Sequence, residues 1–426
     1  MLSQIFRWID GSTPAPNGPL PDLGATRIAR VAPIVLAALG VAALVAFGIL
    51  GVGPHGTTFG LDLGVFWAAG LAWSHGVNPY DHAALSHFSP DAQGVGFFAY
   101  PPNIAPLCLL LGAFPFRVAV WVTVVANVVA LLTIDGMCQR IRRQVDPSAT
   151  GRSWVLTAIV FGNPFSSQVT YLGQTPLIAL AACLCAWRLA AQGKDLPAGV
   201  LLGLACFKPQ IGMLIVVWFV FDRRLKLLAA AGATVAASSI LPAVASGGWG
   251  VAGDWFHAMT IYSGGSNNSV GSAYVFGLAS LLDAMGVQAA GVPLIAAVVF
   301  AAVWYLRRRM VEGEIVAVLL AAPLLFIFAH YFDLVGMLPF VAVFIGFAAH
   351  RRSLLFVGAC LLGVMFVPAQ LVRFLGSPLL NQFRVPVVLA AMSLWVALRV
   401  LRREGGSPSR RGVGGAPGLL GEVERS

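Results

Sequence analysis

The sequence predicts an all-α integral membrane protein, a bundle of about twelve transmembrane helices with a structured first external loop. Two observations point to this class. Hydrophobic residues make up 58% of the chain and charged residues only 10%, with a mean hydropathy of +0.83, whereas soluble proteins carry about 25% charged residues. The apolar residues also fall into runs that end in clusters of Arg and Lys, as the cytoplasmic ends of membrane helices do.

The first predicted element is the apolar run at residues 31–53, which is long enough to cross a bilayer. Residues 1–30 include STPAPNGPLPD and are expected to form a cytoplasmic lead-in. We expect no cleaved signal peptide, because the first run is long enough to remain as a helix. Residues 31–402 are expected to form one transmembrane domain, because a helical bundle in lipid is a single unit.

Further apolar runs predict the remaining spans. Several are shorter than the roughly 20 residues that a crossing needs. We therefore expect either that their true boundaries differ from these or that the short helices cross the bilayer together with neighbouring segments. The runs lie at about 118–137, 153–166, 174–191, 196–207, 209–221, 225–245, 287–306, 314–330, 333–349, 353–372 and 385–401.

The positions of Lys and Arg predict the orientation. With both termini in the cytoplasm, all but four of the 27 basic residues fall on the cytoplasmic side; the exceptions are Arg117, Lys208, Arg373 and Arg384. This split requires that the short, Pro-broken segment YPPNIAPLCLLLGAF, residues 100–114, does not cross the membrane. We interpret it as a re-entrant or interface-lying helix on the outer face.

The same orientation defines the loops. Residues 54–116 form a first external loop and residues 246–285 a second large one, both on the outer face. Residues 403–426, rich in Gly, Ser, Pro and Arg, are expected to be a disordered cytoplasmic tail.

Unusual polar residues converge on the outer face, where the predicted loops and turns would place a chemical site. Ionisable residues at such positions are costly and therefore favour a functional explanation. They are Asp62, His75, Asn78, Tyr80, Asp81, His82, Asn163, Gln168, Tyr171, Gln174, Lys208, Gln210, Asp254, His257, Asn267, Asn268, His330, Tyr331, Asp333, Arg373 and Arg384.

Simpler explanations remain open for four of these residues. Asp62 could cap the helix that follows it, and Asp81 in NPYD could form a turn. Lys208 could extend to lipid headgroups, although the apolar runs on both sides of it are short. His330 could be an ordinary interfacial histidine.

The sequence does not support a nucleic-acid-binding protein, a metal or disulfide protein, or an enzyme with a common soluble-enzyme motif. The net charge of +10 would suit a nucleic-acid partner, but the basic residues lie in short clusters between apolar runs. The six cysteines lie in or beside apolar stretches, which indicates packed thiols rather than a metal site or disulfide. The sequence contains no Walker loop, GxSxG or HExxH motif. We expect no metal and no cofactor.

Five segments, in order, resemble a known family. LDLGVFWAAGLAWSHGVNPYD is similar to the opening signature of glycosyltransferase family 87, YPPNIAPL to its YPP element and YLGQTPLIALAACL to its GQ-containing helix. AGVLLGLACFKPQIGMLIV and HYFDLVGMLP are similar to its later K-P and H-x-Y segments. The resemblance runs from about Gly60 to Pro339. Residues 82–99, residues 246–285 and both ends match nothing in the family pattern.

The resemblance implies a transferase of the GT-C superfamily. Such enzymes take a sugar from a lipid-linked donor, here polyprenyl-phosphate-mannose, and pass it to a lipid or glycan acceptor on the outer, periplasmic face of the inner membrane. In the family the catalytic acid lies in the first external loop, a position that Asp62 matches. The acceptor is left open.

These residues suggest an inverting reaction with Asp62 as general base. The departing phosphate needs a cation in a low-dielectric site, and Lys208 is the first choice, with Arg384 and Arg373 behind it. The candidates for binding the sugar or the acceptor are His330, Gln174, Asn163, Tyr171, Asn78 and Asp81.

Two rival functions remain. A multispan transporter or flippase of a lipid-linked sugar would also use short, Gly- and Pro-interrupted helices, but no internal repeat is visible. Another lipid-phosphate transferase, such as a sugar-polymer ligase, would share the topology without the Asp62 motif.

Overall fold

The structure is a computed structural model, and it describes residues 23–52, 59–88, 97–149, 151–266, 268–272, 274–326, 329–348, 352–367, 372 and 376–404. Helices dominate the described chain, and its β-structure is one two-residue antiparallel pairing, in which Val275 faces His330 and Phe276 faces Ala329. The predicted all-α class is therefore confirmed. The predicted lead-in at residues 1–30 lies largely outside the described residues, and the tail at residues 403–426 almost wholly so.

The first half of the chain contains one long helix, a group of short helices and then the body of the bundle. Its elements are α2 (Leu23–Val52), α3 (Leu63–Ser74), α4 (His82–Ser86), η2 (Pro102–Ile104), α5 (Ala105–Gly112), α6 (Phe116–Val145), α7 (Trp154–Gly162), α8 (Pro164–Leu172), α9 (Pro176–Ala191), α10 (Asp195–Ala205) and α11 (Pro209–Phe221).

The second half adds the helices that close the bundle and the two short strands. Its elements are α12 (Leu225–Ser238), α13 (Ile240–Ala245), α14 (Val251–Gly264), β1 (Val275–Phe276), α15 (Leu278–Ala284), α16 (Val292–Leu306), η3 (Arg307–Arg309), α17 (Glu312–Ala321), α18 (Pro323–Phe326), β2 (Ala329–His330), η4 (Tyr331–Met337), α19 (Leu338–Ala348), α20 (Arg352–Met365), α22 (Pro378–Asn381) and α23 (Arg384–Glu404).

Among the described residues, three helical segments are long and apolar enough to cross a membrane: Phe116–Val145, Leu225–Ala245 and Tyr331–Ala348. The bent pair α8 and α9, which meet at 114°, would make a fourth if it forms one broken span. On α6 the side chains of Trp121 and Val125 are 67% and 60% exposed. A large apolar face open on the surface marks contact with lipid or a partner. The count of about twelve spans stays a prediction.

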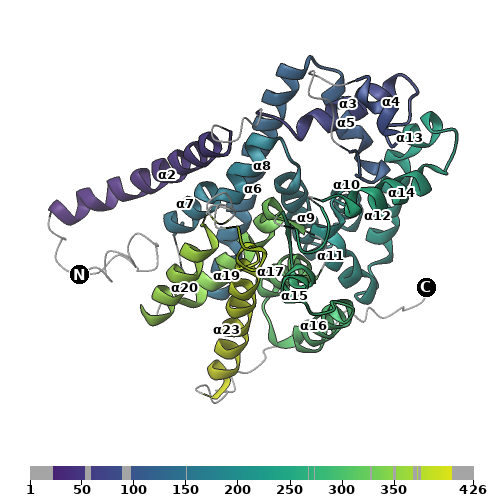
Figure 1. The fold of residues 1–426 in the computed structure, drawn as a ribbon. Coiled ribbons are helices and arrows are strands. Elements are labelled where there is room, and N and C mark those ends of the chain that lie inside the picture. Colours follow the sequence, from purple (N-terminus) through teal and green to yellow (C-terminus); the bar gives the residue numbers. More distant parts are fainter. Residues whose placement is uncertain are drawn as a thin grey trace, which may run out of the picture.

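The helices of the first external loop gather at one end of the molecule, beside α13 and the second-loop helix α14 (Figure 1). α3 and α5 cross in backbone contact at Gly70, where an added Cβ would lie 1.9 Å from the carbonyl oxygen of Cys108. Trp67 Nε1 donates to the carbonyl of Phe114 at 2.8 Å. The predicted helix within residues 100–114 is thus present as η2 and α5, and its re-entrant or interface-lying position stays a prediction.

α10 and α12 are also in close contact, through Gly199 and Gly203. A Cβ at these positions would lie 2.3 Å from the carbonyl oxygen of Leu227 and 2.6 Å from that of Ala231. Small residues allow such backbone approach between apolar helices. The chain then turns at Lys208, and Pro209 starts α11 at a position where its missing N–H costs nothing. This packing places Lys208 at the end of a rigid helix pair.

Candidate functional site

The loop that carries Asp62 is attached to the C-terminal end of α8. The backbone N–H groups of Gly60 and Asp62 donate to the carbonyls of Tyr171 and Leu172 at 2.7 and 3.0 Å. Gly173 ends α8 in the left-handed conformation, with φ +73°, and a Cβ there would lie 2.6 Å from Cβ of Leu63. Only glycine satisfies both demands without strain.

The Asp62 side chain does not cap the helix that follows it. It occupies the N-cap position of α3 but makes no capping hydrogen bond there. Instead, Oδ2 accepts from Gln174 Nε2 at 2.8 Å, and Gln174 Oε1 accepts from the Tyr100 hydroxyl at 2.9 Å. The chain Tyr100–Gln174–Asp62 therefore orients the carboxylate, and the capping explanation does not account for its position.

Lys208 is buried, with 2% of its surface exposed. Its Nζ lies 3.1 Å from Oδ1 of the fully buried Asp333, 4.9 Å from the ring centroid of Phe332 and 5.4 Å from that of Tyr100. Contact with the faces of aromatic rings stabilises an ammonium group. A lysine that extends to lipid headgroups would be exposed at its tip, so that alternative does not fit this burial.

Asp333 joins Lys208 to His330. Its Oδ2 accepts from the backbone N–H of His330 at 2.9 Å, while Oδ1 holds the lysine. Both oxygens of the buried carboxylate are thus satisfied, as a buried charge requires.

His330 links the site to the second external loop. Its Nδ1 lies 3.2 Å from the Tyr274 carbonyl and its Nε2 lies 3.0 Å from the Tyr262 hydroxyl on α14. Burial lowers the pKa of His330, and the charge of Lys208 adds to this effect, while Asp333 opposes it. In the neutral ring Nδ1–H then donates to the carbonyl, and Nε2 accepts from Tyr262.

The causes of the pKa shifts indicate that Asp62, Lys208 and Tyr262 lie in one region of the site. Burial raises the pKa of the Asp62 carboxyl above its ordinary value, and the hydrogen bond from Gln174 and the charge of Lys208 oppose the shift. Burial also raises the pKa of Tyr262; Tyr100, Asp62 and Asp333 add to this shift, and the charge of Lys208 opposes it. A carboxylate, an ammonium group and a tyrosine hydroxyl therefore act on one another here.

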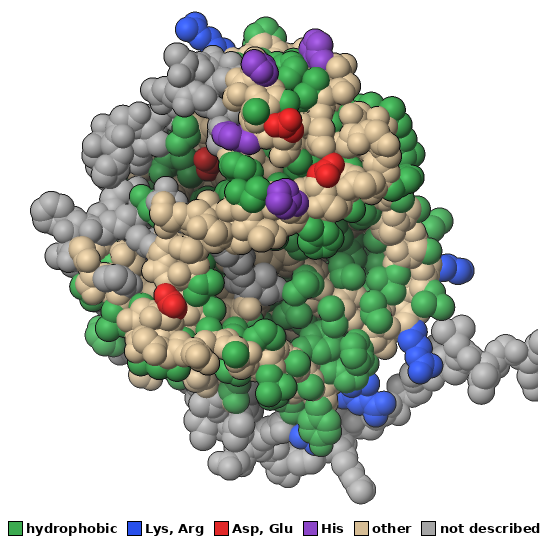
Figure 2. All heavy atoms as spheres, turned by 45° about the vertical axis from the view of Figure 1, so that its right-hand side comes forward, with side chains coloured by type: hydrophobic (Ala, Val, Ile, Leu, Met, Phe, Trp, Pro, Cys, Tyr) green, Lys and Arg blue, Asp and Glu red, His purple; other side chains and the backbone are tan. Residues whose placement is uncertain are grey.

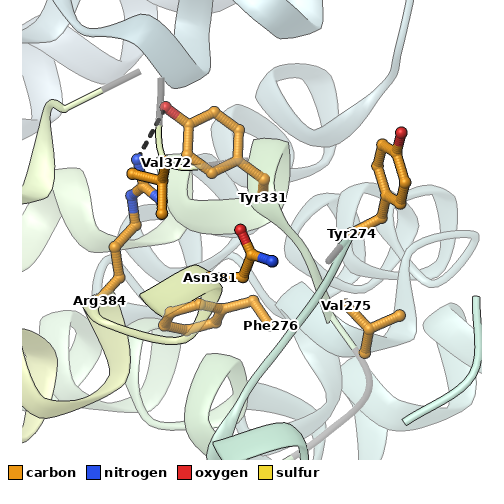
Figure 3. A pocket seen from close by; sticks show the side chains of 7 residues that line it. All are labelled: Tyr274, Val275, Phe276, Tyr331, Val372, Asn381 and Arg384. Atoms are coloured by element: carbon orange, nitrogen blue, oxygen red, sulfur yellow. Dashed lines mark hydrogen bonds between the residues drawn. The ribbon is translucent and has the colours of Figure 1, made fainter. Parts of the chain in front are cut away.

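Arg384 lies in a neighbouring cavity with about 290 Å³ of empty space, shown in Figure 3. Its Nε donates to the carbonyl of Met365 at 3.1 Å, and Nη2 lies 3.5 Å from the Tyr331 hydroxyl. Its guanidinium also stacks on the rings of Tyr331 and Phe383 at 4.4 and 4.2 Å. Because Tyr331 directly follows His330, this second cation adjoins the first site. Arg373 lies outside the described residues.

Two predicted site residues act as helix caps. Asn163 Oδ1 accepts from the N–H of Ser166 at 2.8 Å at the start of α8, and its Nδ2 donates to the carbonyl of Val160. Asp81 accepts from the N–H groups of Ala83 and Ala84 at the start of α4. The turn-forming explanation of Asp81 therefore accounts for its contacts.

Two others connect parts of the site. Tyr171 is buried, and its carbonyl holds the Asp62 loop through Gly60. Asn78 donates to Oδ2 of Asp254 on α14 at 2.8 Å and so ties the first external loop to the second.

Three contributors had no role assigned from the sequence. Asp333 and Tyr100 were visible in the HYFD and YPP segments, and a buried lysine could have directed attention to a carboxylate near the other predicted site residues. Tyr262 lies in residues 246–285, where no motif marks it.

The described residues thus bring a carboxylate, Asp62, and a buried cation, Lys208, together from separate elements of a helical membrane protein. A family model, glycosyltransferase family 87, matches residues 98–330, more than half of the chain. The protein belongs to that family and is a membrane glycosyltransferase. The matched residues include Tyr100, Gln174, Lys208, Tyr262 and His330 and begin after Asp62. No curated protein and no solved structure matches the chain significantly.

Proposed function

We propose that the protein transfers a hexose, mannose by family analogy, from a polyprenyl-phosphate donor to a lipid or glycan acceptor, with inversion at the anomeric carbon. The observation that carries this proposal is that the Asp62 carboxylate caps nothing and is oriented by Gln174, which bonds to Tyr100, whose ring lies 5.4 Å from Lys208 Nζ. A carboxylate held in this way can take a proton, and a cation nearby can stabilise a departing phosphate.

The proposed step is a single displacement. The acceptor hydroxyl attacks the anomeric carbon, and Asp62 takes the hydroxyl proton as the new C–O bond forms. The bond between the anomeric carbon and the phosphate oxygen breaks, and its electron pair leaves with the phosphate. One displacement with one base inverts the configuration. Proton transfer of this kind contributes about 10²–10⁴-fold to the rate.

Lys208 is the proposed contact for the phosphate. An ammonium group has three N–H donors; one bonds to Asp333, and the others face a region lined by the rings of Phe332 and Tyr100. Asp333 thus holds the lysine in place without using all its donors. The Tyr262 hydroxyl, which donates to His330, is a further candidate contact for a hydroxyl of the sugar.

An apolar cavity suits the isoprenoid tail. It has about 560 Å³ of empty space, lies between η4, α19, α20 and α23, and is lined by apolar side chains such as Phe340, Leu361 and Val387. Met365 also lines it, and the Met365 carbonyl accepts from Arg384. A tail in this cavity would bring its phosphate toward Arg384 first, so Arg384 is the alternative phosphate contact.

The raised pKa of Asp62 predicts the pH dependence of transfer. The base works only when ionised, so activity should fall as pH decreases through a pKa above the ordinary aspartate value. Gln174→Leu removes a hydrogen bond that lowers this pKa, so the acidic limb of the rate profile should move to higher pH. The control is Gln382→Leu, which removes a buried glutamine that bonds to the carbonyl of Val275. The acidic limb of its rate profile should lie at the same pH as in the parent. Equal profiles for Gln174→Leu and the parent would argue against Asp62 as the base.

We further propose that the site faces outward from the inner membrane and that both termini are cytoplasmic. On the face shown in Figure 2, histidines gather over the upper part, whereas most visible Lys and Arg side chains lie toward the lower edge. Such a separation supports the positive-inside orientation.

Cysteine labelling in intact cells tests this orientation. In a background without native cysteines, a cysteine at the exposed Ser86 should react with an impermeant reagent. A cysteine at the exposed Lys194 should react only after the membrane is opened. The reverse pattern would overturn the proposed location of the site.

Transfer and transport are separated by the fate of the sugar–phosphate bond. Purified protein in liposomes, supplied with labelled polyprenyl-phosphate-mannose and a membrane lipid extract as acceptor source, should move the label from the donor to a new product. A transporter would carry the donor across and leave the bond intact.

A further inference from the structure

A second polar cavity lies at the opposite end of the bundle from Asp62. It has about 270 Å³ of empty space between α6, α9 and α17, and its polar lining consists of Arg140, Gln144, Arg188 and Glu312. Asn127, whose amide bonds to the Gln174 carbonyl near the site, precedes Arg140 on α6 by about 13 residues, or about 20 Å at 1.5 Å per residue. The cavity therefore lies apart from the proposed catalytic groups.

The charges in this cavity do not cancel. Gln144 donates to the Glu312 carboxylate at 3.1 Å, and neither arginine forms an ion pair with Glu312 among the described residues. Gln192 accepts from Arg188 when its amide is turned to satisfy both groups. Arg140 is half-buried and has no hydrogen-bond or ion-pair partner within the described part of the chain. Two guanidinium groups thus face one carboxylate that is already bonded.

An oxyanion in the cavity would give Arg140 the partner that it lacks among the described residues. The planar fork of arginine donates two parallel hydrogen bonds to a phosphate and is used for this purpose in preference to lysine. A half-buried arginine without a partner has lost part of its hydration, so a bound anion would recover that cost.

The surface beside the cavity indicates that the phosphate belongs to a lipid. Val125, Val129 and Leu132 form an exposed apolar stripe on α6. Residues three and four positions apart share a helix face, so the stripe continues through Gly136 to Arg140. Acyl chains could lie along this stripe while the headgroup reaches the cavity. We propose that this cavity binds the phosphate headgroup of an anionic phospholipid.

The test measures lipid retention by the full-length protein in native mass spectrometry, with phosphatidylglycerol and phosphatidylcholine as probes. The parent protein should retain phosphatidylglycerol in preference to phosphatidylcholine. Arg140→Gln should lower that retention about fivefold, the effect of removing one basic contact with an anionic lipid. Arg140→Lys should keep most of it, because the charge remains.

The matched control is Arg143→Gln, which removes the same charge from an exposed position of the same helix and should retain phosphatidylglycerol like the parent. Equal retention by Arg140→Gln and the parent would overturn the proposal. So would an equal loss in Arg143→Gln, which would indicate general surface charge. Displacement of the lipid by inorganic phosphate would show a site for free phosphate and overturn the lipid assignment. Equal melting temperatures of the parent and the variants verify folding.

Discussion

Asp62→Asn should leave folding and donor binding intact and lower the rate of sugar transfer by about 10²-fold or more. The amide keeps the size of the side chain and can still accept a hydrogen bond from Gln174, but it cannot take a proton from the acceptor. Since the Asp62 carboxylate caps nothing in the structure, the substitution removes no contact of the fold. The rate is measured with purified protein and labelled polyprenyl-phosphate-mannose, and folding by the melting temperature.

Asp81→Asn is the matched control for this substitution. Asp81 lies in the same loop and caps α4 through the N–H groups of Ala83 and Ala84. Asparagine caps a helix as well as aspartate does, so stability and transfer should stay near the parent values. Transfer within a few-fold of the parent in Asp62→Asn would rule out the assignment and move the base to His330.

Lys208→Met should reduce both stability and transfer. The substitution leaves the Asp333 carboxylate buried without its counter-charge, and breaking a buried pair in this way costs about 3–5 kcal/mol. Transfer should fall by about 10²–10³-fold as well, because one stabilising donor to the departing phosphate is lost. Thermal unfolding and the transfer rate are measured on the same preparation.

The double variant Lys208→Met with Asp333→Asn separates the two effects. It removes both charges, so most of the lost stability should return, while transfer should stay low. Lys208→Arg should keep part of the activity, since arginine also binds phosphate but with a bulkier, planar group. If the double variant regains transfer, Lys208 has a structural role only and Arg384 becomes the phosphate contact.

Much of the local structure could be predicted from the sequence. Membrane helices satisfy their backbone groups within one segment, so apolar runs predict them from neighbouring residues alone, and the all-α class is confirmed. The caps formed by Asn163 and Asp81 are also local, because each bonds to an N–H two or three residues ahead. The motifs likewise mark Asp62, Gln174, Lys208 and His330 as candidate site residues.

The pairings between those residues could not be predicted. Gln174 and Asp62 are 112 residues apart, and Lys208 and Asp333 are 125 apart. No motif in the second external loop marks Tyr262, whose hydroxyl lies 3.0 Å from Nε2 of His330, 68 residues further along the chain. The sequence also left capping by Asp62 and lipid contact by Lys208 open.

By itself, then, the sequence determined the helical membrane class, the family and the residues that merit attention, because each depends on composition or on short motifs. Tertiary structure alone decided that Asp62 is bonded to Gln174 rather than to its own helix and that Lys208 is buried against Asp333. The physical reason is that a polar side chain is stabilised by whichever distant groups the packed helices bring within hydrogen-bond distance. Those groups depend on the crossings at Gly70, Gly199 and Gly203, which no local pattern specifies.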